Sequence, residues 1–99
     1  MMQKSARILV PWYRYPPFTP GQTGGLSVSV WELTQKLASL GFGIACVTPK
    51  QEGIPENETL GGVDVHRNNL GDKLVSGMRL DRTDKKFIES FDAVLSIEN

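Results

Sequence analysis

The sequence predicts an α/β domain built on a parallel sheet, and three observations support this fold class. Two short segments rich in apolar and β-branched residues, 7–10 and 42–48, are typical of parallel strands buried on both faces. Between them, residues 25–40 carry the spacing of an amphipathic helix. A strand, a helix and a strand within about 40 residues form a βαβ unit, whose crossover is right-handed in nearly all proteins. We therefore expect a single domain over residues 1–99, with four parallel strands in the order 3-2-1-4.

The first strand, residues 7–10, ends at Pro11 and leads into a long loop. Prolines at 11, 16, 17 and 20 argue against helix and sheet pairing as far as residue 23. This loop also holds four aromatic residues: Trp12, Tyr13, Tyr15 and Phe18. Their rings either cover the end of the sheet or line a pocket for an apolar or sugar-like ligand. The two interpretations do not exclude each other, and the sequence favours neither.

Gly24 and Gly25 open the helix around which the domain is organised. Apolar residues follow at 26, 30, 33, 37 and 40, so Leu33 and Leu37 are expected at the centre of the buried face. Gly41 marks the end of the helix, where a left-handed cap is common. Free N–H groups and the positive end of the helix dipole suit a phosphate at the glycine pair, which has no Cβ to obstruct it. The alternative is that the pair only permits a tight turn or close packing.

The second strand, residues 42–48, ends before Pro49, and the polar residues 50–61 are expected to form a surface loop. Residues 63–67 alternate between apolar and polar, which indicates a third strand with one wet face, at the edge of the sheet. This strand contains His66, the only histidine. Since no other ligands stand at metal-binding spacing, we interpret His66 as a surface or edge residue rather than a catalytic base.

The last third of the chain predicts one helix and one strand. Before this helix, apolar positions are scattered and interrupted by two glycines, so only a helical turn is expected there. Asp81 or Thr83 can cap a short helix that runs to Phe91 and stacks Phe87 on Phe91. Residues 92–97 form the fourth strand.

Charge and composition exclude several classes of function. The charges of the 11 basic and 11 acidic residues cancel, so the net charge is zero. A chain without excess positive charge is not expected to bind nucleic acid or an anionic membrane. No segment has the character of a signal peptide or of a membrane span of about 20 residues, so we place the chain in the cytoplasm. Cys46, the only cysteine, lies in an apolar run and is expected to be an inert buried thiol. The expected partner is a small molecule or a protein, and no metal or cofactor is expected.

The order of these signals resembles the N-terminal part of the family-four (group 1) retaining glycosyltransferases, which have the GT-B fold. The glycines fit neither the dinucleotide fingerprint Gly-x-Gly-x-x-Gly nor a Walker loop. The resemblance begins with Ile8-Leu9-Val10 and runs through Tyr15-Pro16-Pro17, Gly24-Gly25 and the apolar helix positions to a strand that ends in Val47-Thr48. It continues weakly through residues 62–67 and 91–94. Starch and glycogen synthases, which share a similar Gly-Gly-Leu opening, are a nearby second match.

The resemblance implies a Rossmann-like N-terminal half that holds the acceptor and faces a C-terminal half that holds the nucleotide sugar. Gly24 and Gly25 would give N–H groups to the diphosphate of the donor. The loop from Trp12 to Phe18 would border the acceptor, a small molecule or a glycan. The implied reaction transfers a glycosyl group to an acceptor hydroxyl with retention of the anomeric configuration. No residue of this chain is assigned a catalytic role.

Two features of the family pattern are missing, so the chain alone is expected to be inactive. No two of its glutamates lie eight positions apart, as they do in the donor-binding motif, and His66 comes too early to match the family's cleft histidine. The sequence also stops after the fourth strand, which a helix normally follows. We therefore expect an incomplete half whose exposed apolar surface meets a missing half or a partner chain, or promotes self-association. The alternative function is a non-enzymatic Rossmann-like module that binds a phosphorylated ligand or a partner chain.

Overall fold

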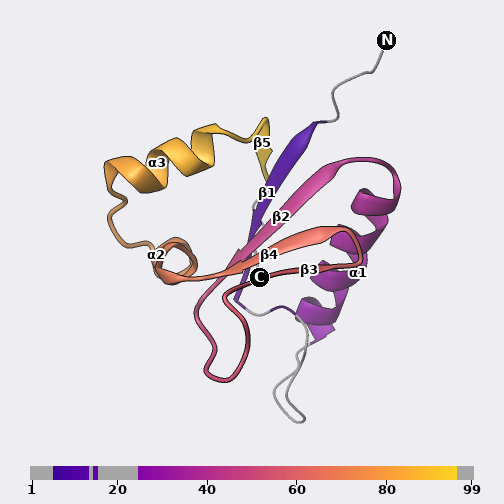
Figure 1. Cartoon of the computed structure of the whole chain (residues 1–99), viewed down its shortest axis with the longest axis horizontal. Coiled ribbons are helices and arrows are strands. Elements are labelled where there is room, and N and C mark those ends of the chain that lie inside the picture. Colours follow the sequence, from indigo (N-terminus) through magenta and orange to yellow (C-terminus); the bar gives the residue numbers. More distant parts are fainter. Residues whose placement is uncertain (1–5, 14, 16–24, 96–99) are drawn as a thin grey trace.

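The computed structural model describes residues 6–13, 15 and 25–95, with only the backbone at residues 25 and 26. This part of the chain folds into a five-stranded sheet with helices on both faces (Figure 1). Its strands are β1 (Arg7–Pro11), β2 (Gly43–Thr48), β3 (Asn57–Leu60), β4 (Val63–Arg67) and β5 (Ala93–Val94). Its helices are α1 (Gly25–Ser39), α2 (Asn69–Ser76) and α3 (Arg82–Glu89). The predicted α/β class is therefore confirmed.

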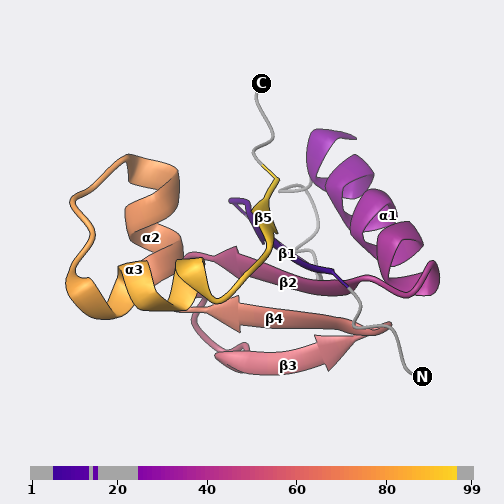
Figure 2. The ribbon, with the colours of Figure 1, turned by 90° about the horizontal axis from the view of Figure 1, so that it is seen from above.

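The strand order is β3-β4-β2-β1-β5, and the sheet is mixed (Figure 2). The strands β4, β2, β1 and β5 are parallel neighbours, whereas β3 pairs antiparallel with β4. The four expected strands are therefore present as parallel neighbours, but the expected all-parallel sheet is wrong because it lacks β3, an antiparallel fifth strand. Residues 57–60 form this strand inside the segment that was expected to be a surface loop. As a consequence, β4 lies inside the sheet and not at its edge.

A two-glycine turn accounts for the additional strand. Gly61 and Gly62 have φ values of 57° and 86°, and a type I′ hairpin turn needs positive φ at both central positions. The strands β3 and β4 pair on either side of this turn, beginning with Leu60 opposite Val63. A glycine pair between two alternating segments is a strong hairpin signal, so the sequence contained the information that predicts β3.

Alternate side chains of the strands face two separate apolar clusters, as the period of a strand requires. One cluster joins Val10, Cys46 and Val65 of the sheet to Val30 of α1. The other joins the strand residues Leu9, Ala45 and Val47 to the helices α2 and α3, through Leu70, Leu74, Phe87 and Ile88. The helix α1 therefore covers one face of the sheet, and α2 and α3 cover the other (Figure 1).

The buried face of α1 is rotated relative to the expected one. Val30 and Thr34 are 2% and 0% exposed, whereas Leu33 is 41% exposed and Leu37 is half-buried. The prediction that both leucines lie at the centre of the buried face is therefore wrong: Leu33 is exposed, and Leu37 packs against the core only as a half-buried side chain. Thr34 is tolerated in the core because its hydroxyl donates to the carbonyl oxygen of Val30 at 3.0 Å and is also bonded to the hydroxyl of Tyr15.

The C-terminal glycine of α1 and the N-cap of α3 agree with the sequence prediction, whereas α3 ends before the expected Phe91. Gly41 follows α1 with φ 99°, the left-handed conformation expected of a C-terminal glycine. Asp81 is the N-cap of α3, which ends at Glu89. The rings of Phe87 and Phe91 meet edge to face with their centroids 5.3 Å apart, which confirms the predicted contact.

The helix α2 is longer than the single turn that was expected, and both of its ends are capped. The side-chain oxygen of Asn68 accepts the N–H of Gly71, and Gly77 closes the helix with φ 67°. Gly71 allows α2 to approach the sheet closely, since a Cβ there would lie 1.9 Å from the carbonyl oxygen of Thr48. This contact places the start of α2 at the carboxyl end of β2.

Candidate functional site

The first turn of α1 lies at the carboxyl edge of the sheet, where β1 and β2 end. Trp12, which follows β1, donates its backbone N–H to the carbonyl oxygen of Val47 at 3.0 Å. Its indole Nε1–H donates to Ser27 Oγ, in the first turn of α1, also at 3.0 Å. Trp12 is buried, so the indole holds a fixed position between the strand ends and the helix. The helix that begins at Gly25 thus has its N-terminus where ligands bind in open α/β sheets.

A second polar tether holds the middle of α1. Tyr15 is fully buried, and its hydroxyl is bonded to Thr34 Oγ1 and accepts from Gln35 Nε2 at 3.3 Å. Gln35 also donates to the carbonyl oxygen of Leu60 at 2.8 Å, which connects α1 to the end of β3. Because the hydroxyl proton of Thr34 is given to the backbone, Tyr15 is the donor in their shared bond. Burial raises the pKa of Tyr15, so this hydroxyl keeps its proton.

The four aromatic residues that the sequence singled out are not equivalent. Trp12 and Tyr15 belong to the apolar core, as expected if these rings cover the end of the sheet. Tyr13 is 53% exposed, and its ring lies edge to face with Trp12 at a centroid distance of 5.2 Å. Phe18 and Gly24 lie outside the described residues. Among the described residues of the loop, Tyr13 is therefore the aromatic side chain open to a ligand.

A cavity of about 360 Å³ opens at the same edge, on the sheet face covered by α2 and α3. Its lining combines two apolar side chains, Leu70 and Phe87, with the polar side chains of Lys50, Glu56, Asn68, Asn69, Thr83 and Asp84. Lys50 and Asn68 follow the ends of β2 and β4, which places the cavity at the strand ends. Amide and hydroxyl groups beside apolar side chains suit a small ligand rich in hydroxyl groups.

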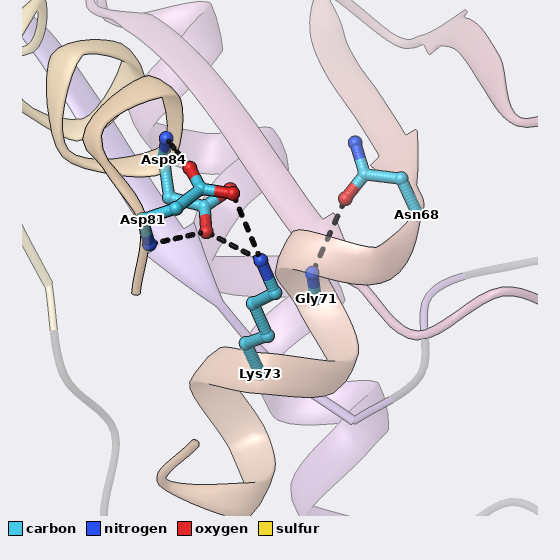
Figure 3. A network of polar contacts seen from close by, with 5 residues as sticks. All are labelled: Asn68, Gly71, Lys73, Asp81 and Asp84. Atoms are coloured by element: carbon cyan, nitrogen blue, oxygen red, sulfur yellow. Dashed lines mark hydrogen bonds and ion pairs between the residues drawn. The ribbon is translucent and has the colours of Figure 1, made fainter. Parts of the chain in front are cut away.

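A polar network fixes the two helices that border this cavity (Figure 3). Lys73 of α2 reaches α3, where its Nζ lies 2.6 Å from Asp84 Oδ2 and 3.4 Å from Asp81 Oδ2. Asp81 and Asp84 also accept each other's backbone N–H in a capping box. The hydrogen bond from Lys73 lowers the pKa of Asp84 and raises the pKa of Lys73. Both groups are therefore charged at neutral pH, which makes the network a structural ion pair rather than a proton donor.

Arg67, at the carboxyl end of β4, is a fully buried cation that the sequence analysis did not single out. Its Nη1 donates to Glu58 Oε1 at 2.7 Å and to the carbonyl oxygen of Pro55 at 3.0 Å. These bonds attach β3 and the residues before it to β4. The alternation of the strand was the available signal, because Arg67 shares its face with the buried Val63 and Val65.

The structure places Cys46 and His66 on opposite faces of the sheet. Cys46 is buried on the α1 face, as predicted, and burial raises the pKa of its thiol to about 12. His66 is half-buried, with Nδ1 3.0 Å from Asn57 Oδ1 and its ring 5.5 Å from that of Phe87. It lies on a strand inside the sheet and packs against α3, so of the two expected positions, the surface or the sheet edge, the edge is wrong.

The described residues bring a helix N-terminus, one exposed aromatic ring and a polar cavity to one edge of the sheet. Within residues 6–13, 15 and 25–95, no three His, Cys, Asp or Glu side chains gather as a metal site requires. No helix in the described part of the chain is long and apolar enough to cross a membrane. No family model, curated protein or solved structure matches the chain, so a functional proposal rests on the residues of this edge.

Proposed function

We propose that this chain is the acceptor-side domain of a glycosyltransferase, which moves a sugar from a nucleotide-sugar donor to an acceptor hydroxyl with retention of configuration. The observation that carries the proposal is the fixed N-terminus of α1 at the carboxyl edge of the sheet, held by the bond from Trp12 Nε1 to Ser27 Oγ. The motif order that resembles the group 1 glycosyltransferases supports it. In this proposal a Rossmann-like N-terminal half faces a donor-binding half across the same edge.

The first turn of α1 suits the diphosphate of such a donor. Its N–H groups have no carbonyl partner within the helix, and the turn carries no acidic side chain to repel an anion. When the bond between sugar and diphosphate breaks, negative charge grows on the phosphate oxygens. N–H groups placed beside those oxygens stabilise the transition state more than the bound substrate, which raises turnover. In the proposal Gly24 and Gly25 leave room for the oxygens to approach.

The acceptor is assigned to the cavity at the ends of β2 and β4. The amide of Asn69 and the hydroxyl of Thr83 can bond sugar hydroxyls, and the ring of Phe87 offers an apolar wall. Trp12 and Tyr15, which the resemblance places beside the acceptor, are buried in the core and are not proposed to touch it.

The isolated chain is proposed to be inactive, because it would supply only one side of the donor site. The other side would come from the donor-binding half. Two exposed apolar side chains fit a surface that such a half would cover: Leu33 and Val94. Sedimentation over a concentration series should show self-association of the isolated chain. A strictly monomeric chain with a high unfolding temperature would argue against this part of the proposal.

The glycosyltransferase proposal is tested in the longer protein that joins residues 1–99 to a donor-binding half. Gly25→Val should lower the transfer rate about a hundredfold or more, since losing one oxyanion donor costs about 3–4 kcal/mol in the transition state. Thermal unfolding should change little, because this position precedes the contacts of α1 with the sheet. Ser39→Ala, at the other end of α1, is the control and should alter neither measurement.

Three results would contradict the proposal. If Gly25→Val unfolds the protein, the glycine pair serves packing. If it changes neither transfer nor unfolding, α1 does not hold the donor. If the gene encodes no donor-binding half, the alternative of a non-enzymatic module that binds a phosphorylated ligand replaces the enzyme.

A further inference from the structure

A second cavity, of about 530 Å³, lies at the turn between α2 and α3. It is lined by Arg79, Leu80, Asp81, Arg82 and Lys85. In both overall views this turn lies across the molecule from α1 (Figures 1 and 2). Arg82 and Lys85 project from one side of α3, whereas Thr83 and Phe87 project from the other and line the cavity at the strand ends. The two cavities are therefore separate.

The charges on this lining do not balance. Three cations and one carboxylate give a charge of 3 − 1 = +2, in a chain whose net charge is zero. Asp81, the one carboxylate, accepts the N–H of Asp84 at 2.8 Å and lies 3.4 Å from Lys73 Nζ. Asp84 also pairs with Lys73, at 2.6 Å. Asp81 and Asp84 thus interact with Lys73 and with the backbone of the capping box, and not with the three cations of the cavity. The cavity therefore has a positive electrostatic potential.

The three cavity cations lack the ion pairs that hold several other cations of the described chain. Lys50 pairs with Glu56, and Arg67 pairs with Glu58. The guanidinium of Arg7 lies over a phenylalanine ring and donates to a backbone carbonyl. By contrast, Arg79, Arg82 and Lys85 have no ion-pair partner among the described residues. Lys36 and Lys86 have none either, but they do not line the cavity. Cations gathered around one hollow repel each other, and a bound anion would remove this repulsion.

We propose that this cavity binds an anion carrying two or more phosphate charges, through Arg79, Arg82 and Lys85. A guanidinium binds phosphate oxygens with paired, charge-assisted hydrogen bonds, and a lysine adds a point charge. Arg82 and Lys85 are neighbours on the surface of α3, and the capping box fixes the turn that carries them. The ligand class is a diphosphate or bisphosphate group, carried by a free small molecule or by a lipid headgroup.

The test uses sodium pyrophosphate as the probe and the ¹⁵N-labelled chain as the reporter. We expect saturable NMR shifts at the amides of residues 79–85. The double variant Arg79→Gln/Arg82→Gln should weaken binding about tenfold or more, because each guanidinium makes charge-assisted bonds. The matched control Lys36→Gln/Lys86→Gln removes the same charge from outside the cavity and should weaken binding no more than about threefold. Circular dichroism checks that each variant is folded.

A second set of measurements identifies the source of the phosphate. Binding to phosphatidylcholine vesicles that contain phosphatidylinositol bisphosphate, and displacement by pyrophosphate, would support the proposal and identify a lipid headgroup. Binding of pyrophosphate without vesicle binding would support it and identify a free ligand. Absence of saturable shifts, or equal weakening by the two double variants, would overturn it. Shifts confined to the first turn of α1 would also overturn it, while they would support the proposed donor site.

Discussion

The two faces of the sheet are attached to their helices in different ways. On the α1 face, polar side chains are buried within the layer: Tyr15, Thr34 and Arg67 are each 0% exposed. Each of them has a partner from another part of the chain, as in the bond between Tyr15 and Thr34. On the other face, the buried cluster is apolar, and the capping side chains of Asn68 and Asp81 act at the helix ends. The first face therefore depends on tertiary partners, whereas the second depends on close approach and local capping.

The largest effect is expected on the second face, where α2 meets β2. A Cβ at position 71 would collide with backbone atoms of Thr48 and Pro49, which cannot yield without moving the strand end. Although alanine is the better helix former, Gly71→Ala should destabilise the fold by about 3 kcal/mol or more. The control is Gly77→Ala, because no atom lies within 4 Å of a Cβ built at that position. Its expected cost of about 1–2 kcal/mol comes from the left-handed backbone conformation alone. Equal losses in chemical denaturation would show that α2 does not approach β2 closely.

On the first face, the rotated helix is tested by a pair of truncations. Val30→Ala should cost about 2 kcal/mol, because its side chain is 2% exposed in the cluster beneath α1. Leu33→Ala should cost less than about 1 kcal/mol, because that side chain is largely in solvent. Denaturation curves of both variants measure the difference. A larger loss of stability in Leu33→Ala than in Val30→Ala would support the predicted buried face, which is centred on Leu33 and Leu37.

The difference between the faces also explains what could be predicted from sequence. The helix α3 was predicted almost to its ends, since Asp81 and the spacing of Phe87 and Phe91 are local signals. The orientation of α1 was not, because Leu33 fits the helical period as well as Val30 does. What selects the buried face is the set of partners that Tyr15 and the distant β3 supply, which periodicity does not contain.

The candidate site divides in the same way. The start of α1 at Gly25 was predicted from the glycine pair and the apolar spacing that follows it. The cavity at the strand ends was not predicted, because its lining comes from the segments after β2 and β4 and from α3. No single stretch of sequence carries that pattern. The strand β3 is different, because the glycine pair Gly61 and Gly62 is a local signal for the hairpin turn. No physical reason therefore prevented the prediction of β3 from sequence.

A smaller effect is expected from the cap of α3. Asp81→Ala removes the acceptor for the N–H of Asp84 and should cost about 1 kcal/mol. Asp81→Asn keeps a good N-cap acceptor and should stay close to the wild type. Thermal or chemical unfolding of the two variants separates capping from charge. If asparagine is as damaging as alanine, the ion pair with Lys73 matters more than the cap.

The smallest effect concerns the pH dependence of the ion pair between Lys73 and Asp84. The pKa of Asp84 lies below its usual 3.8, so the stability that the pair contributes is lost as pH falls through that lowered value. The pKa of Lys73 lies above its usual 10.5, so the contribution is lost again as pH rises through that raised value. The difference in unfolding free energy between wild type and Lys73→Met should therefore be flat from about pH 5 to about pH 9. A difference that varies within this window would contradict the assignment, and Lys85→Met is the control without an ion pair.

The first turn of α1 as a phosphate-binding edge is tested most directly by one NMR titration of the ¹⁵N-labelled chain with pyrophosphate. We predict saturable shifts of the Trp12 indole N–H and the amide of Ser27, with roughly millimolar affinity, since one wall of the site makes few contacts. These shifts should vanish in Gly25→Val and persist in Arg79→Gln/Arg82→Gln, which separates this site from the basic cavity. If the folded chain shows no shift at Trp12 or Ser27 at any pyrophosphate concentration, α1 does not present a phosphate site.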